Sequence, residues 1–181
     1  MTLRARLTAP FALAACLATL ATPAGTARAD DAASWDGKAP FSCSSGKHVL
    51  DGVTADLDGT AVVAHGTCEL VVRNAKIRGG ASALTAHGAA VVRVEKSELS
   101  SRGPAVIAHG STEIALEGVY VSGRVAVAAH GVTVVSVSNA SRLVGAPIAI
   151  AASGSARVKV AQGCSVTGGT NKSGGSDVAI E

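Results

Sequence analysis

The tripeptide Ala-His-Gly occurs four times in this chain, around His65, His87, His109 and His130. A fifth copy, Ala152-Ser153-Gly154, keeps the frame but has serine in place of histidine. The glycines of the five copies follow one another after 22, 22, 21 and 23 residues. A sequence that repeats at such a period forms stacked units, each too small to bury a core alone. The repeat therefore limits this chain to a solenoid or a related architecture.

Apolar residues keep fixed positions around each of these glycines. They lie four residues before the glycine and four and six residues after it, and an alanine lies two residues before it. Apolar residues two apart are typical of a strand with one buried face. Another apolar residue precedes a glycine-containing turn in each repeat. We therefore expect short strands separated by turns, with no room for a helix.

Strands of this kind, stacked about 4.8 Å apart along an axis, form a parallel β-helix. The pattern resembles the right-handed parallel β-helix (pectate-lyase-like) superfamily over residues 41–169. The resemblance concerns the fold, because one fold carries many unrelated functions. We expect an all-β chain that forms a small right-handed parallel β-helix solenoid of five to six coils, with about 22 residues per coil.

The first 29 residues indicate a secretory leader, with Arg4 and Arg6, an apolar run at 7–21 and a cleavage site at 27–29. In a competing interpretation, residues 13–16 resemble the lipobox of bacterial lipoproteins and Cys16 is acylated. The rest divides into an N-terminal cap at 30–46, the β-helix at 47–169 and a linker and tail at 170–181. The last five residues, 177–181, form either a closing strand or a disordered tail. We expect a secreted or periplasmic protein, which touches a membrane only if Cys16 carries lipid.

The formal charge of +3 belongs to the leader, because cleavage after residue 29 removes three arginines and leaves 13 basic and 13 acidic residues. A neutral mature chain has no basic field to attract nucleic acid, so a nucleic-acid partner is not expected.

Three cysteines follow the leader. A disulfide is the usual state of cysteines in an exported protein, and Cys43 with Cys68 is the expected pair because it would join the first coil to the second. Cys164 is expected to be a small buried hydrophobic residue. No Cys-x-x-Cys spacing occurs, so the cysteine pattern does not indicate a zinc site. His48 lies outside the histidine repeat and is expected to pack or to cap.

Side-chain alternation predicts that the alanine before each repeated histidine points inward and the histidine outward. His65, His87, His109 and His130 then form a ladder on the surface, about 4.8 Å apart. Three interpretations remain open. The ladder is structural, or neighbouring imidazoles bind Zn²⁺, Cu²⁺ or Ni²⁺, or the ladder belongs to a face that pairs with a second copy or another protein. No cofactor other than these metals is expected.

Small, mostly apolar residues are predicted beside the ladder on the same exposed face. They are Ala61, Val63, Ala83, Thr85, Ala105, Ile107, Ala126 and Ala128. An exposed apolar strip of this kind marks an interaction surface. We refer to the ladder and this strip together as the His/Ala face.

The superfamily resemblance implies a carbohydrate-active enzyme as one alternative. Such enzymes use paired carboxylates or a calcium site, whereas Glu95 and Glu117 lie in one row beside Arg73, which is typical of a solvated charge ladder. The sequence favours an exported, non-enzymatic module that binds a partner or self-associates through the His/Ala face. The alternatives are a polysaccharide lyase-like enzyme or sugar-binding protein, and a transition-metal binder that uses the histidine ladder.

Overall fold

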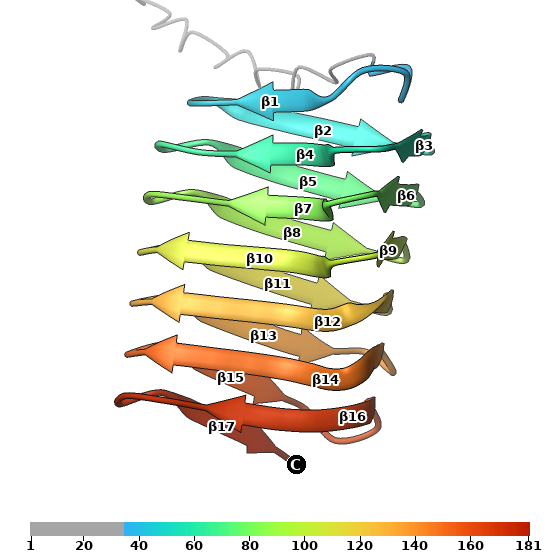
Figure 1. The fold of residues 1–181 in the computed structure, drawn as a ribbon. Coiled ribbons are helices and arrows are strands. Elements are labelled where there is room, and N and C mark those ends of the chain that lie inside the picture. Colours follow the sequence, from blue (N-terminus) through green and yellow to red (C-terminus); the bar gives the residue numbers. More distant parts are fainter. Residues whose placement is uncertain (1–34) are drawn as a thin grey trace, which may run out of the picture.

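The computed structural model describes residues 35–181, which form a parallel β-solenoid (Figure 1). Strands of successive repeats stack in register, with about 22 residues per turn and about 6 turns. The predicted parallel β-helix is confirmed. The expected leader, Cys16 and residues 30–34 of the expected cap lie outside the described residues. Within the described part of the chain, no helix is long and apolar enough to cross a membrane.

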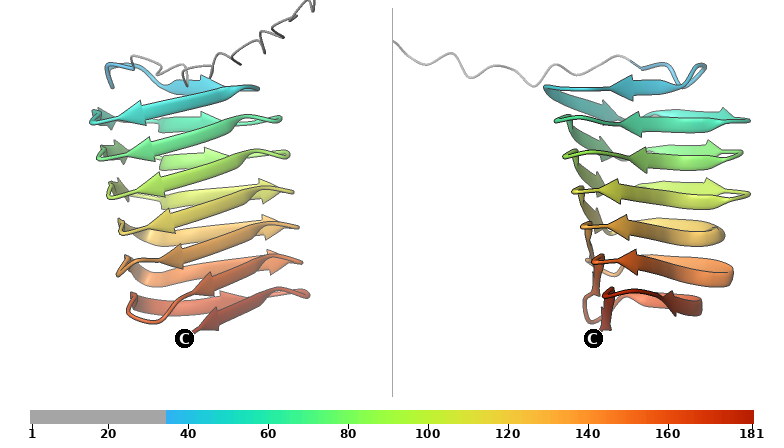
Figure 2. Two further views of the ribbon diagram at one scale, coloured as in Figure 1. Left: turned by 180° about the vertical axis from the view of Figure 1, so that it is seen from behind. Right: turned by 60° about the vertical axis from the view of Figure 1, so that its left-hand side comes forward.

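One wall of the solenoid is a seven-stranded parallel sheet, which lies in front when the molecule is seen from behind (Figure 2). Its strands are β2 (Lys47–Asp51), β5 (Glu69–Arg73), β8 (Val91–Glu95), β11 (Glu113–Glu117), β13 (Val134–Ser138), β15 (Arg157–Val160) and β17 (Asp177–Ile180).

A ten-stranded parallel sheet bends around a corner and forms the other two walls. One side contains β3 (Thr54–Leu57), β6 (Lys76–Gly79) and β9 (Glu98–Ser101), and the other contains β1 (Phe41–Cys43), β4 (Thr60–Ala64), β7 (Ser82–Ala86) and β10 (Pro104–Gly110). The long strands β12 (Tyr120–Gly131), β14 (Arg142–Gly154) and β16 (Ser165–Lys172) run through both sides. For example, β12 pairs with β9 at its start and with β10 at its end.

The core consists of columns of similar apolar side chains. Parallel pairing in register places each residue directly beside its counterpart in the next repeat, so a residue type repeated in the sequence becomes a column in space. Ile77, Leu99, Val121 and Leu143 form one such column, and each is at most 1% exposed. Burial of these columns supplies the hydrophobic stabilisation of the solenoid.

The repeated glycines form tight turns that stack on one another. Gly110 has a φ of 81°, a left-handed conformation that side chains disfavour. A Cβ added there would lie 3.1 Å from the Gly88 carbonyl oxygen of the preceding coil. The turns are also joined by hydrogen bonds, because the Ser111 amide donates to that same oxygen at 2.7 Å. The glycine repeat is therefore required both by the backbone conformation and by the close approach of the turns.

Two predicted boundaries differ from the structure. The segment at 170–181, expected to be a linker and tail, continues the solenoid as the end of β16 and as β17, which pairs with β15. Gly174, with a φ of 68°, takes the position of the repeated glycines in this last coil. At the other end, β1 lies within the expected cap but pairs with β4 as part of the first coil.

The predicted disulfide between Cys43 and Cys68 is confirmed. Cys164 is a free thiol and is half-buried rather than fully buried as expected. Trp35 and Phe41 pack against the core at the N-terminal end of the solenoid. Their ring centroids are 5.9 Å apart, so two of the few aromatic residues cover this end of the core.

The stacked glycine turns generate the first testable prediction. Changing Gly110 to alanine strains a left-handed residue and crowds the turn beside it, so we expect a loss of about 1–3 kcal/mol in the free energy of unfolding. The matched control is Gly59→Ala, where an added Cβ meets nothing within 4 Å. Urea unfolding of the two variants measures the difference, and equal stabilities would contradict this role of the turn.

Candidate functional site: the histidine ladder

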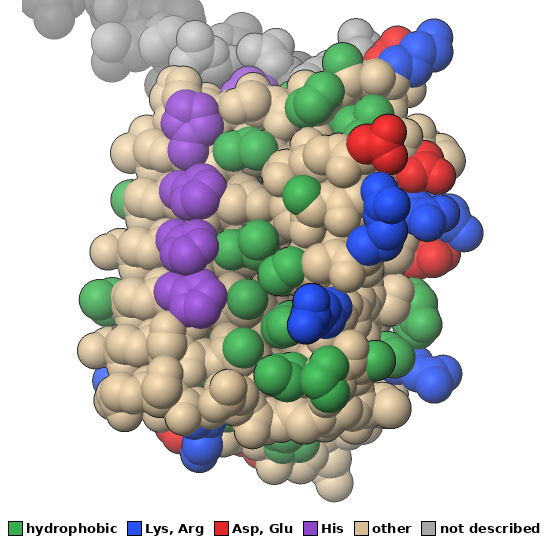
Figure 3. Space-filling model, in the orientation of Figure 1, with side chains coloured by type: hydrophobic (Ala, Val, Ile, Leu, Met, Phe, Trp, Pro, Cys, Tyr) green, Lys and Arg blue, Asp and Glu red, His purple; other side chains and the backbone are tan. Residues whose placement is uncertain are grey.

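The four histidines of the repeat form one column along the wall made by β4, β7, β10 and β12 (Figure 3). His65 and His87 directly follow β4 and β7, whereas His109 and His130 lie within β10 and β12 and pair with each other. The coils fix this alignment through the backbone, since the His87 amide donates to the Ala64 carbonyl at 2.8 Å. The predicted ladder therefore follows from the register of the coils.

Three of the imidazole rings are stacked face to face. The ring centroids of His87 and His109 are 5.4 Å apart with planes inclined by 8°, and those of His109 and His130 are 4.8 Å apart with planes inclined by 21°. His130 Nδ1 also lies 2.6 Å from the Ser153 hydroxyl oxygen, within hydrogen-bonding distance. The serine that replaces histidine in the fifth Ala-His-Gly copy thus continues the column as a hydrogen-bond partner.

The stack favours neutral rings. Partial burial lowers the pKa of His87, and the neighbouring His109 and His65 lower it further. The pKa of His109 is lowered by partial burial first and by His130 second. Burial disfavours the charged ring, and each imidazolium repels the next, so folding opposes protonation of the central histidines.

The stacked arrangement does not bring the ladder nitrogens together around one point. The lone pair of an imidazole nitrogen lies in the plane of its ring, so nearly parallel rings direct their lone pairs side by side rather than towards a shared ion. In the described residues, the one group of at least three candidate metal ligands within 4.8 Å of one another is Cys43, His48 and Cys68. Chelation by two ladder histidines would require one ring to rotate out of the stack.

The predicted alanine strip is wrong in part. Ala61, Ala83, Ala105 and Ala126 are 0% exposed and belong to the core. Alternation fails at the corner of the sheet, where Ala83 and Leu84 are both buried in succession. Ser82 and Thr85, three residues apart, instead share one side of the strand, with their hydroxyl oxygens 2.8 Å apart. These alanines therefore line the inside of the corner and are unavailable to a partner.

The row directly beside the ladder is exposed only in part. Val63 and Ile107 are half-buried, whereas Thr85 and Ala128 are 7% and 6% exposed, so the predicted exposure of these two is also wrong. We refer to the four histidines with Val63, Thr85, Ile107 and Ala128 as the ladder face. It presents small, mostly apolar side chains beside imidazole rings and contains no Asp, Glu, Lys or Arg.

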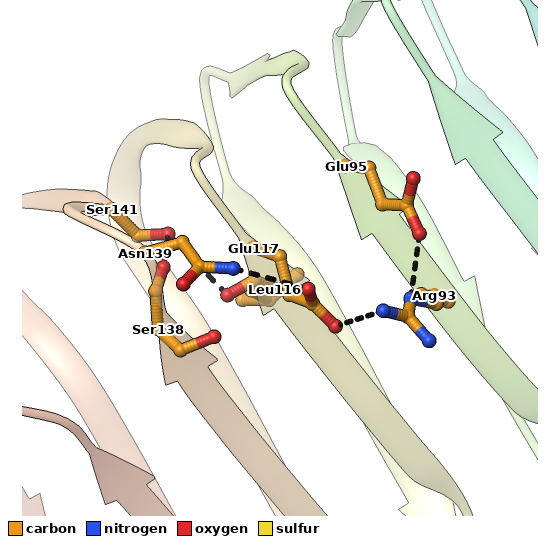
Figure 4. Close-up of polar contacts among 7 residues, drawn as sticks. All are labelled: Arg93, Glu95, Leu116, Glu117, Ser138, Asn139 and Ser141. Atoms are coloured by element: carbon orange, nitrogen blue, oxygen red, sulfur yellow. Dashed lines mark hydrogen bonds and ion pairs between the residues drawn. The ribbon is translucent and has the colours of Figure 1, made fainter.

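The row of carboxylates considered in the sequence is held by an arginine from a neighbouring row (Figure 4). Arg93 Nε contacts Glu95 at 2.6 Å, and Arg93 Nη2 contacts Glu117 at 2.8 Å. Glu117 also accepts a hydrogen bond from Asn139 at 3.2 Å. Arg73, which the sequence places beside these carboxylates, pairs with Asp51 instead. Arg93 therefore bridges the two adjacent carboxylates, and Glu117 is held by Asn139 as well.

A shallow polar groove on the wall of β3, β6 and β9 was not predicted from the sequence. Its charged side chains pair with one another, since Lys76 contacts Glu98 at 3.1 Å and Arg78 contacts Asp56 at 3.7 Å. The repeat pattern places these residues in outward rows, but the pairing depends on side-chain positions that spacing does not specify.

Comparison with models of protein families, with curated proteins and with solved structures found no match. The likeness to the parallel β-helix superfamily is therefore one of fold, and function has to be inferred from the ladder face itself.

The lowered pKa values of His87 and His109 predict a loss of stability in acid. Folding favours the neutral rings, so the two histidines contribute to the free energy of unfolding. This contribution is fully present above about pH 6.5 and disappears as the pH falls through the lower pKa of the folded state. Urea unfolding of the wild type and of a His87→Gln/His109→Gln variant, at pH 7.5 and at about pH 5, measures it. We expect the wild type to lose more stability than the variant. Equal losses of stability in the wild type and the variant would contradict a link between folding and the protonation of these two rings.

Proposed function

We propose that this protein is an exported, non-enzymatic binding module that pairs with a second copy of itself through the ladder face. The observation that carries the proposal is the column of four imidazoles (Figure 3) beside half-buried apolar side chains. The column lies on a wall whose strands are stacked side by side (Figure 1). Exposed apolar surface of this kind is typical of an interaction site.

A second copy of the chain fits this surface best, because its rows of side chains have the same spacing along the solenoid. Every row of the ladder face repeats with the distance between stacked strands, about 4.8 Å. A second molecule, turned by a two-fold axis, presents rows with the same repeat, so rings and apolar side chains match along the full column. Two-fold pairing of identical patches is the commonest mode of association in homo-oligomers.

The electrostatics of the ladder support association in the neutral state. The rings are already less readily protonated than a free imidazole at His87 and His109. Pairing would bury them further and bring a second column of histidines close, and both effects disfavour the charged form. A dimer formed through this face should therefore dissociate in acid.

The two alternatives have less support. A metal bound between ladder histidines needs a ring to leave the stack, because the planes of His87 and His109 differ by only 8°. For a carbohydrate-active enzyme, Glu95 and Glu117 are the adjacent carboxylates, and Arg93 contacts both of them. The stacked histidines would have to rearrange to bind a metal ion, and the two carboxylates would have to leave Arg93 to act in catalysis.

Export is supported by the leader pattern and by the disulfide between Cys43 and Cys68. Disulfides persist in oxidising compartments such as the periplasm and the cell exterior.

The proposed dimer is tested by sedimentation velocity at increasing protein concentration. We expect concentration-dependent dimers at pH 7.5, and their loss at about pH 5 as the imidazoles become charged. Ile107→Arg places a charge in the centre of the ladder face and should abolish the dimer at pH 7.5.

The matched control is Val91→Arg, on the seven-stranded sheet, where the side chain is 45% exposed and lies outside the ladder face. This variant should dimerise like the wild type. A wild-type protein that stays monomeric at all concentrations, or an Ile107→Arg variant that still dimerises, would contradict the proposal.

A further inference from the structure

Two cysteines and a histidine converge at the first coil, away from the ladder face. Cys43 lies in β1, Cys68 directly precedes β5, and His48 lies in β2. Their candidate ligand atoms all lie within 4.8 Å of one another. Neighbouring ligand atoms in a tetrahedral zinc site with two thiolates and an imidazole are about 3.6–3.8 Å apart. The three side chains therefore need only small movements to surround an ion once the sulfurs are no longer bonded.

The backbone holds these residues in place independently of the disulfide. The Cys43 carbonyl accepts from the His65 amide at 2.9 Å, and the Cys68 amide donates to the His65 carbonyl at 3.2 Å. His48 is held in β2 by its in-register pairing with Leu70 in β5. Opening the disulfide leaves these hydrogen bonds intact, so the two thiols remain next to each other and to the imidazole.

The imidazole of His48 is prepared to act as a ligand. Its Nε2 lies 2.9 Å from the Ser45 carbonyl oxygen. A carbonyl oxygen accepts hydrogen bonds and cannot donate them, so Nε2 carries a hydrogen, and in the neutral form of the ring Nδ1 bears the lone pair that a metal ion would take. Metal-bound histidines have this arrangement, in which the second ring nitrogen donates to a carbonyl that fixes the ring.

We propose that the reduced protein binds one Zn²⁺ ion through Cys43, Cys68 and His48, with water in the fourth position. A dithiol reductant transfers two electrons and two protons to the disulfide and becomes a cyclic disulfide itself. Zn²⁺ then displaces the two thiol protons to solvent and binds the thiolates. Two thiolates and an imidazole are a donor set that zinc prefers.

The burial of the two cysteines supports a specific metal site rather than non-specific binding at the surface. Cys68 is 0% exposed and Cys43 is 5% exposed, whereas His48 is half-buried. The ion would thus be enclosed on the sulfur side and reached by water on the imidazole side. In the oxidised protein the sulfurs bond to each other, so the disulfide and the zinc site are alternative links between the same two coils. This inference does not depend on the ladder face.

The experiment uses Co²⁺, a spectroscopic substitute for Zn²⁺, added to the Cys164→Ser protein reduced by a dithiol that is then removed without oxygen. We expect a single Co²⁺ ion to bind with thiolate charge-transfer and tetrahedral ligand-field bands, which Zn²⁺ abolishes by displacement. The oxidised protein should show neither band. His48→Ala should weaken binding by about tenfold or more, and His109→Ala should leave it unchanged.

Three results would overturn the proposal. One is a reduced protein without the thiolate band. Another is identical metal binding by the oxidised and reduced forms, which would assign the metal to the histidine ladder. The third is a His48→Ala variant with unchanged affinity and spectrum. If reduction alone unfolds the chain, Zn²⁺ must restore the strand signal in circular dichroism, and failure to restore it would equally overturn the proposal.

Discussion

The hydrogen bonding between successive coils, parallel and in register, is the interaction on which the other features depend. It converts a period in the sequence into columns in space, because each residue lies beside its counterpart one repeat away. The apolar columns of the core, the stacked glycine turns and the row of histidines all arise in this way. Because of the same constraint, a side chain added in one turn would crowd the backbone of the neighbouring turn, as at Gly110 beside Gly88.

Stacking of identical residues has different consequences for different side chains. Apolar residues gain burial, whereas titratable residues are brought close to their own kind. Glu95 and Glu117 are brought side by side in this way, and Arg93 bridges them. Among the residues that the structure describes, no acidic side chain forms an ion pair with His87 or His109, and the pKa values of both are lowered. A column of neutral, stacked rings is then a surface whose charge depends on pH.

The fold and the histidine column could be predicted because both depend on period and alternation. The disulfide could be predicted because the period places Cys43 and Cys68 in adjacent coils of a chain expected to be exported. The exposure of Ala61 and its equivalents could not, since the sheet turns a corner there and consecutive residues face inward. The part of the last coil at 170–176 was missed because the glycines and polar residues around Gly174 resemble a linker, whereas a closing strand at 177–181 was one of the two alternatives. The approach of His48 to Cys43 and Cys68 depends on which strands meet at the end of the solenoid, which spacing does not reveal.

Pairing of two ladder faces in the neutral state can be followed by NMR on the ring protons of His87 and His109. If the faces pair, both rings titrate below the ordinary value of 6.5, and raising the protein concentration lowers their titration midpoints further. Rings that titrate at the ordinary value, with resonances and midpoints that do not change with protein concentration, would contradict the pairing of ladder faces.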